Sequence, residues 1–336
     1  MAKGLDVGTM NLVSTQLEKG KYVIKQQRNM FLEMDANEVT GQMLQHANIL
    51  HMKMGNEYVI VGEDALNFST VMNTEAKRPM KQGILARDEK QAIPMMRLIM
   101  ERLLGPAAHP KEVVYYTSPG NPVDGKRNIL YHQKILEHVL RKMGYDPYVI
   151  NEGLTVVYQE LKDQEFTGMG ISCGAGMVNV ALAHMGVPLT SFSVQRGGDW
   201  IDMQVMEATG QSKDKVTVEK EKSFRMDKRE GLNQVKAALA IYYDNLLDYA
   251  TRWMENELRR VNIDEGITVP VVITGGTSSP AGFVQAFEQR LRKAKFPFEV
   301  GTVRAGNSNL FTVSLGCLVA ARVKEAELKE QRATAA

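Results

Sequence analysis

Cysteine is almost absent: the 336 residues include two, Cys173 and Cys317, both in apolar stretches that contain glycine. Two cysteines so placed give no disulfide framework and are typical of small buried thiols in a reducing compartment. No cysteine or histidine group has the spacing that metal ligands require. The composition therefore excludes a disulfide-stapled fold and a zinc-finger type of site.

An excess of charge of one sign is also missing, since 41 Lys and Arg residues against 39 Asp and Glu residues leave a formal charge of +2. Nucleic acid is therefore not an expected partner, although a local basic patch is compatible with this balance. No apolar run reaches the roughly 18 residues that cross a bilayer, and Asp6 interrupts the early one. These absences predict a cytoplasmic protein, and they disfavour membrane association but leave it open.

The sequence does contain a repeated strand–turn–strand pattern. The first copy, residues 4–13, is centred on Gly-Thr-Met-Asn, and the second, residues 169–182, is centred on Gly-Ala-Gly. Further strands and then helices follow each copy. The repeat predicts an α/β protein of two similar lobes, with mixed β-sheets flanked by helices around a cleft.

Hydrophobic spacing predicts further elements along the chain. Strands are expected at 21–27 and 58–61, paired with each other, and residues 31–55 have no assignable pattern. A helix is expected at 124–143. A second helix is expected at 231–261, and its length leaves open whether it is interrupted.

Both copies of the repeat place glycines in their turns, Gly8 in the first and Gly174 and Gly176 in the second. A third turn, Gly275-Gly276, follows a buried β-branched strand, and ligands of α/β folds bind beyond such strand ends. Tight glycine turns expose backbone N–H groups, which bind anions and phosphate above all. One such turn is equally explained by hairpin geometry, but three of them favour a phosphate-binding cleft.

Asp6 lies on the strand that leads into the first turn. A carboxylate beside a phosphate site repels the ligand unless a cation lies between them. Mg²⁺, which keeps several of its waters, is the expected cation. The alternative is an aspartate that caps its own turn.

Five motifs, in this order, resemble those of the actin, Hsp70 and sugar-kinase superfamily, and together they span nearly the whole chain. They are the first phosphate motif Asp6-Val-Gly-Thr-Met-Asn11, the connecting helix with Glu152-Gly153, the second phosphate motif with Gly174-Ala-Gly176, the adenosine motif Thr274-Gly-Gly276, and the second connecting helix with Leu315-Gly316. The resemblance implies an actin-like fold around a nucleotide cleft.

Within the superfamily, the sequence is most similar to the prokaryotic actin-like branch of MreB and MamK. Residues 78–85 and 194–202 are similar to segments of that branch that precede a long helix and follow the second phosphate hairpin. Glu219 and Lys222 have its Glu-x-x-Lys spacing. The resemblance implies that Glu219 contacts the ribose and Lys222 the base, and the alternative is a solvated ion pair on a charged helix.

The resemblance also implies how the chain divides. Lobe I would comprise residues 1–150 plus 310–330, with a small subdomain at about 30–75. Lobe II would comprise residues 151–309, with a small subdomain at about 210–262.

The implied site binds ATP or ADP with Mg²⁺ between the lobes. Glu152 and Asp6 are the implied catalytic residues, Glu152 by orienting a water and Asp6 as the metal-binding residue. A bulky side chain at Gly275 is expected to abolish binding by blocking the approach to the backbone. The implied nucleotide-binding residues are Gly8, Thr9, Met10, Asn11, Gly174, Ala175, Gly176, Glu219, Lys222, Gly275, Gly276 and Thr277.

The second phosphate motif departs from the family pattern. Ser172 and Asn179 stand where relatives have acids, and Met177 stands where they have threonine. Gly153 also replaces the usual proline. Because a hydroxyl or an amide does not attract a cation as a carboxylate does, we expect a weak ATPase at most.

The favoured hypothesis is an ATP-binding actin-like cytoskeletal protein that assembles into filaments and hydrolyses ATP slowly. Its partners would be other copies of the chain and a cargo or scaffold protein. The alternative is a non-polymerising actin-fold adaptor or a chaperone-like ATPase that acts on a partner complex. A sugar kinase is disfavoured because no sugar-binding carboxylate stands in the expected place.

Overall fold

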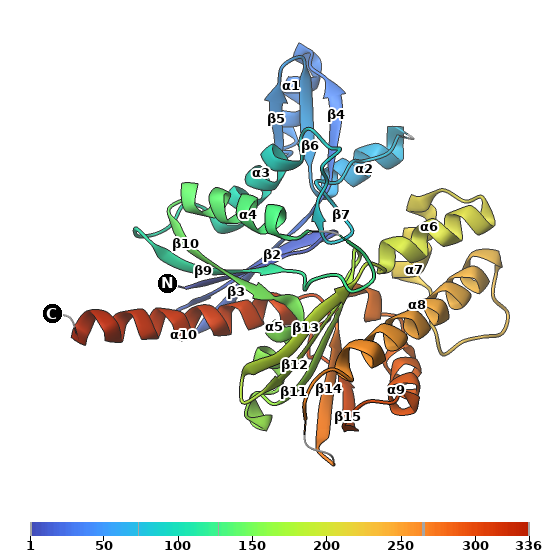
Figure 1. The fold of residues 1–336 in the computed structure, drawn as a ribbon. Helices are drawn as coiled ribbons and strands as arrows, with labels where there is room; N and C mark the ends of the chain where they lie inside the picture. The colour runs from blue at the N-terminus through green and yellow to red at the C-terminus, as the bar shows by residue number, and fades with distance from the viewer. Residues whose placement is uncertain (1, 73, 127, 264–265, 335–336) are drawn as a thin grey trace.

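The computed structural model describes residues 2–72, 74–126, 128–263 and 266–334, and it has two lobes that each contain a five-stranded sheet (Figure 1). The first sheet consists of β1 (Lys3–Val7), β2 (Asn11–Glu18), β3 (Lys21–Arg28), β9 (Glu112–Ser118) and β10 (Tyr145–Asn151). Its order is β10-β9-β1-β2-β3. The hairpins β1–β2 and β2–β3 are antiparallel, whereas β9 pairs in parallel with β1 and β10.

The second sheet repeats this plan. It consists of β11 (Gly168–Cys173), β12 (Val178–His184), β13 (Val187–Val194), β14 (Thr268–Thr274) and β15 (Glu299–Ala305), in the order β13-β12-β11-β14-β15. Again two antiparallel hairpins are followed by two parallel strands. The two-lobed α/β architecture predicted from the repeat is therefore confirmed.

Two helices lie between the sheets. Helix α5 (Glu152–Glu160) packs on β11 and β12, helix α10 (Thr312–Thr334) packs on β1 and β9, and the two helices pack on each other. Glycine permits the close approach, because a Cβ on Gly316 would lie 2.0 Å from the carbonyl oxygen of Thr155. In Figure 1 the far end of α10 extends beyond the sheets.

A smaller three-stranded sheet projects from the first lobe, at the top of Figure 1. It has the order β4-β6-β5 and is flanked by two helices. Its elements are β4 (Phe31–Asp35), α1 (Glu38–His46), β5 (His51–Met54), β6 (Glu57–Val61) and α2 (Glu63–Met72). Residues 31–55, which the sequence left unassigned, thus form two strands and a helix.

The remaining elements include the helices that pack on the two large sheets. In the first lobe they are β7 (Met80–Lys81), β8 (Ile84–Leu85), α3 (Ala92–Leu104) and α4 (Leu130–Lys142). In the second lobe they are η1 (Lys162–Gln164), α6 (Gly198–Thr209), α7 (Lys213–Lys222), α8 (Gln234–Leu258), η2 (Gly276–Ser278) and α9 (Phe283–Lys293). Within the described residues, no helix is both long and apolar enough to cross a membrane.

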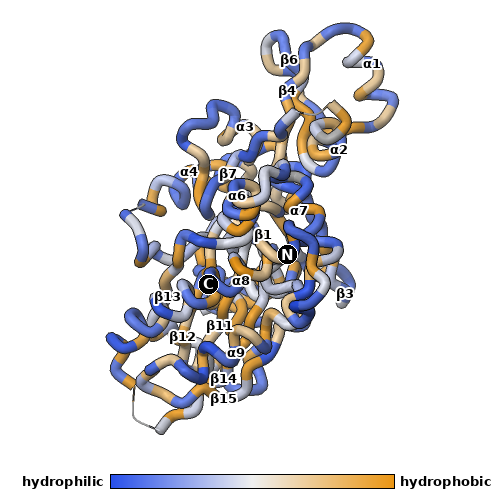
Figure 2. Tube along the Cα trace, turned by 90° about the vertical axis from the view of Figure 1, so that its right-hand side faces the viewer, coloured by the Kyte–Doolittle hydropathy of each residue, from blue (hydrophilic) through white to orange (hydrophobic). Residues whose placement is uncertain are grey.

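Each large sheet has its own apolar core. In the first lobe, Leu5 and Leu12 pack with Met96 and Ile99 of α3, all fully buried. In the second lobe, the buried faces of β11 and β14 pack against α8 and α9. Figure 2 shows hydrophobic residues along these strands and hydrophilic residues at many of the connecting loops.

Two expectations differ from the observed elements, namely the pairing of two strands and the start of one helix. The strands at 21–27 and 58–61 exist but do not pair with each other, because β3 pairs with β2 and β6 pairs with β4 and β5. The long helix at 231–261 is a single unbroken helix, α8.

The helix expected at 124–143 begins only at Leu130, because the chain before it lies along β13 of the other lobe. Val123 N–H donates to Ser193 O at 3.0 Å, and Ser193 N–H donates to Asn121 O at 3.1 Å. Arg127, which belongs to the expected helix, lies outside the residues that the structure describes.

Candidate functional site

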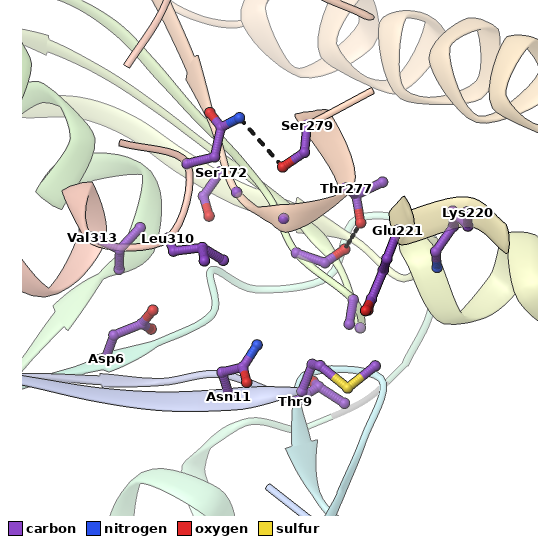
Figure 3. Close-up of a pocket in the computed structure, with 18 of the residues that line it drawn as sticks. Asp6, Thr9, Asn11, Ser172, Lys220, Glu221, Thr277, Ser279, Leu310 and Val313 are labelled. Atoms are coloured by element: carbon purple, nitrogen blue, oxygen red, sulfur yellow. Dashed lines mark hydrogen bonds between the residues drawn. The ribbon is translucent and has the colours of Figure 1, made fainter. Parts of the chain in front are cut away.

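A cleft of about 840 Å³ lies between the lobes. Figure 3 shows Asp6, Thr9 and Asn11 on one wall, facing Ser172 and Thr277 on the other. Three backbone turns and the acidic residues Asp6 and Glu152 are among the features that line it. Each of these features is built locally and is then brought into place by the packing of the lobes.

The first turn joins β1 to β2 and is closed by a hydrogen bond from Gly8 N–H to Asn11 O at 3.0 Å. A Cβ on Gly8 would lie 2.6 Å from that oxygen, so only glycine fits. Asn29 holds the turn from behind: its main-chain N–H donates to Met10 O and its amide Nδ2 donates to Gly8 O. The N–H groups of Thr9 and Met10 have no protein acceptor in the described residues.

The second turn joins β11 to β12, with Gly174 N–H donating to Met177 O at 2.9 Å. The start of α6 occupies its carbonyl side, where Gly198 N–H donates to Gly174 O and Asp199 N–H donates to Ala175 O. Because both carbonyl groups are engaged on that side, the turn presents its other side to the cleft.

The third turn follows β14 and contains Gly275 and Gly276. Gly275 has a φ of +100°, and a Cβ on it would lie 2.3 Å from the carbonyl oxygen of Cys173. A side chain there would therefore disturb the second sheet before it reached any ligand. At Gly276, by contrast, the nearest atom to an added Cβ is a methyl group of Leu310 at 3.9 Å. Gly276 is thus the glycine at which a side chain would enter the cleft.

The hydroxyl groups of Thr9 and Thr277 serve the protein itself. Thr9 Oγ1 accepts from Gly83 N–H at 3.0 Å, which holds the β7–β8 turn beside the first glycine turn. Thr277 Oγ1 donates to Gly174 O at 2.8 Å and so joins the second and third turns. Both residues line the cleft. The Thr277 hydroxyl uses its proton on Gly174 O, whereas the Thr9 hydroxyl accepts a hydrogen bond and keeps its own O–H for a ligand.

Asp6 and Glu152 lie on the floor of the cleft. Burial away from water raises the pKa of Asp6, while the hydroxyl of Thr117, 3.1 Å away, acts in the opposite direction. Burial and then repulsion by Asp6 raise the pKa of Glu152. The described residues contain no group of three or more His, Cys, Asp or Glu side chains that could hold a metal by themselves.

Ser172 and Asn179 are opposite each other on β11 and β12 and lie beside Glu152. Ser172 Oγ is 3.4 Å from Glu152 Oε2, and Asn179 Oδ1 accepts from Gly120 N–H of the other lobe at 3.0 Å. Hydrogen bonds from both residues favour the ionised form of Glu152 and oppose part of the rise in its pKa. They hold the acid in place but add no negative charge.

Helix α7 places its residues differently from the expectation for Glu219. Lys220 is buried and pairs with Asp202 at 2.7 Å, which fixes how the helix is turned. Glu219 then contacts Lys236 of α8 at 3.3 Å and is not among the described residues that line the cleft. Glu221 and Lys222, at the end of the helix, line the cleft instead.

All the other residues expected at the site line this cleft. The expectation missed a group on the first lobe that consists of Gln26, Gln27, Arg28 and Glu63. Arg28 could have been found from the hairpin register, because it is the cross-strand partner of Asn11.

Comparison with solved structures reveals the same fold in several proteins. A MamK double helical filament matches with a TM-score of 0.69 and 16% identity, over 96% of this chain and 98% of that one. MreB5 of Spiroplasma citri bound to ADP matches with a TM-score of 0.66 and 14% identity, over 98% of both chains. The ethanolamine utilization protein EutJ from Carboxydothermus hydrogenoformans matches with a TM-score of 0.51 and 14% identity, over 94% of this chain and 88% of that one.

These likenesses confirm the actin-like fold predicted from the motifs, and at such identities they show the fold alone. No curated protein matches the sequence. The family described as Volactin matches residues 1–321.

Proposed function

Because the chain belongs to the Volactin family and has the actin-like fold, we propose that it binds ATP or ADP in the cleft between its lobes. The observation that carries the proposal is the convergence of three glycine turns on one cleft. Unpaired N–H groups in such turns bind phosphate oxygens. The ADP that MreB5 binds in its solved structure supports the same class of ligand.

Mg²⁺ fits this proposal as the counter-ion of the phosphates. Asp6 and Glu152 offer the hard oxygen ligands that Mg²⁺ prefers, and Mg²⁺ keeps waters where the protein supplies few ligands. Asp6 would hold the ion through water. When bound, the ion would neutralise charge on the phosphates.

Glu152 is the group that would orient an attacking water in this cleft. Its neighbours Ser172 and Asn179 fix its position through hydrogen bonds without adding charge. Because phosphoryl transfer depends on positioning and charge stabilisation, we propose that hydrolysis is slow.

We further propose that the protein assembles with copies of itself into filaments in the cytoplasm. The fold likeness to a MamK double helical filament supports self-association. A cargo or scaffold protein would be a second partner. The adaptor or chaperone-like ATPase is the competing proposal, because the fold is shared with an ethanolamine utilization protein as well as with a filament former and does not by itself imply assembly.

The proposed division of the chain places residues 1–150 and 310–330 in lobe I, and residues 151–309 in lobe II. Small subdomains at about 30–75 and 210–262 complete it.

Titration calorimetry with ATP and ADP in the presence of Mg²⁺ tests the site. Gly276→Val should abolish binding because the added side chain enters the cleft, whereas Thr302→Val on the exposed face of β15 should leave it unchanged. Gly275 is the poorer test, because a change there strains the fold itself. Absence of nucleotide binding by the wild type would reject the proposed function.

Light scattering with and without ATP, followed by electron microscopy, tests assembly. Filaments that form only with nucleotide would support the proposal. A protein that stays monomeric at high concentration with ATP would favour the adaptor.

A further inference from the structure

Arg28 is the last residue of β3 and lies directly beside the first glycine turn. It is the cross-strand partner of Asn11, and its Nη1 atom is 3.4 Å from Met10 Sδ. Its side chain is 16% exposed, so the guanidinium is held largely inside the cleft.

Two carboxylates from different lobes share this guanidinium. Nε of Arg28 donates to Oε2 of Glu63, the first residue of α2, at 2.8 Å. Nη2 lies 3.7 Å from Oε2 of Glu221 on α7, which reaches it across the cleft. The two acidic side chains are 61% and 44% exposed. Ion pairs at such exposure are weak and screened, so a stronger anion can displace them.

The other cations of the cleft are engaged elsewhere or lie on the opposite wall. Lys220 is buried with Asp202, and Arg225 forms two hydrogen bonds with Asp227. Lys222 lies on the second lobe. On the first lobe, Arg28 is therefore the one cation among the described residues that line the cleft.

A guanidinium binds phosphate through two parallel charge-assisted hydrogen bonds, which are stronger than a long, exposed pair with a carboxylate. We propose that Arg28 senses the phosphates of the bound ligand. This inference rests on the proposed nucleotide site. In the empty cleft it is shared between Glu63 and Glu221, and the ligand's phosphates take it from Glu221. The Arg28–Glu221 pair and the contact of Arg28 with a bound di- or triphosphate then exclude each other.

Ligand binding would thus release one contact between the lobes while another persists. Arg78 of the first lobe pairs with Asp199 at the start of α6, and both side chains are mostly buried. The Arg78–Asp199 pair does not line the cleft among the described residues. Nucleotide binding would therefore break the Arg28–Glu221 contact across the cleft, while the Arg78–Asp199 pair keeps the lobes together.

Calorimetry with ATP, ADP and adenosine on matched variants tests this role. Arg28→Ala should weaken ATP and ADP binding about tenfold or more and leave adenosine binding unchanged, because adenosine has no phosphate. Glu221→Gln should strengthen ATP and ADP binding severalfold by removing the competitor. This gain should vanish in the Arg28→Ala, Glu221→Gln double variant. Arg97→Ala, on the exposed face of α3, is the control.

Three outcomes would overturn the inference: unchanged ATP and ADP binding in Arg28→Ala, weaker ATP binding in Glu221→Gln, or an equal loss of adenosine and ATP. Arg28→Lys, which keeps the charge and loses the two-pronged geometry, should retain part of the affinity if Arg28→Ala proves poorly folded. A wild type that binds no nucleotide would reject the proposed function and this inference together. A wild type that binds ATP as tightly as Arg28→Ala would reject the inference alone.

Discussion

Asp6 and Glu152 are the residues on which the chemistry of the cleft depends. Within the described part of the chain, no Lys or Arg forms an ion pair with either carboxyl group. Burial therefore raises the pKa of both carboxyl groups and favours their protonated forms in the ligand-free protein, and repulsion by Asp6 adds to the effect at Glu152. A divalent cation would reverse that preference, which links ligand binding to pH.

We expect the ligand-free protein to lose stability as the pH rises from about 5 to about 8. The folded-state pKa of both carboxyl groups is raised, so in this window the folded protein binds more protons than the unfolded chain. That stabilising contribution is complete below the unfolded-state pKa and is lost as the pH rises through the folded-state values. Thermal unfolding of the wild type and of Glu152→Gln measures it.

The decline should be smaller in Glu152→Gln, because the amide does not titrate. Identical pH profiles for the two proteins would contradict the assignment of the effect to this acid.

Ser172 is the residue at which turnover should be adjustable. Ser172→Asp places a carboxylate next to Glu152, where the resemblance to the superfamily implies an acid, and with Mg²⁺ should raise phosphate release about tenfold or more. Ser172→Asn has a similar shape without the charge and should not raise it. Glu152→Gln should lower whatever turnover exists. Equal rates in the Asp and Asn variants would show that charge at this position is not what limits hydrolysis.

Among the elements, the loop between β9 and α4 also links the lobes, as α5 and α10 do. Asp124 in this loop accepts hydrogen bonds from Gln195 N–H at 2.8 and 3.0 Å and from the hydroxyl of Tyr249 at 2.8 Å. The same loop reaches the site, because Gly120 N–H donates to Asn179. Because Asn179 also lies beside Glu152, docking of the loop is coupled to the placement of that acid.

Asp124→Ala should destabilise the protein by about 1.5–3 kcal/mol, the usual range for hydrogen bonds to a charged group. Tyr249→Phe removes one of these bonds and should cost about 1 kcal/mol. The midpoint of urea unfolding measures both. Asp88→Ala, which removes an exposed ion pair with Lys81, should leave the midpoint unchanged. An equally stable Asp124→Ala would mean that the loop docks through its backbone alone.

In the molecule as a whole, the two lobes carry exposed apolar side chains far from the cleft. The β12–β13 hairpin presents Met185 in its turn and Val187 and Leu189 at the start of β13, and these are 64%, 63% and 44% exposed. This hairpin belongs to the lower lobe in Figure 1, away from the small sheet with α1 at the top. In a head-to-tail filament, one surface of each copy contacts a different surface of the next copy, and the contact repeats without closing a ring. Exposed apolar surfaces at separate places on the molecule are suited to such a contact.

If copies of the chain assemble through this hairpin, a Val187→Glu, Leu189→Glu double variant should abolish sedimentation with ATP and leave nucleotide binding intact. The charges would be buried without partners in the contact. Tyr22→Glu, on the exposed edge of the first sheet, is a matched apolar-to-acidic control. Normal assembly of the double variant would place the contact elsewhere.

The sequence by itself determined the repeat, the order of the motifs and the three glycine turns. These features are local: a hairpin turn needs glycine where a Cβ would meet the chain itself, as at Gly8 with Asn11 three residues on. The alternation of strands and helices also follows from short-range hydrophobic spacing. The two-lobed fold was predictable for that reason, and so was most of the cleft.

Only the tertiary structure decided which side chains face a ligand. The buried Lys220–Asp202 pair turns α7 so that Glu221 reaches the cleft and Glu219 contacts α8. The hydroxyl of Thr277 donates a hydrogen bond to Gly174 in the second turn, and Arg28 pairs with Glu221 of the opposite lobe. Each of these outcomes depends on partners more than 15 residues away in sequence, which no local pattern encodes. Packing within the second lobe brings most of these partners together, and packing between the lobes brings Arg28 to Glu221.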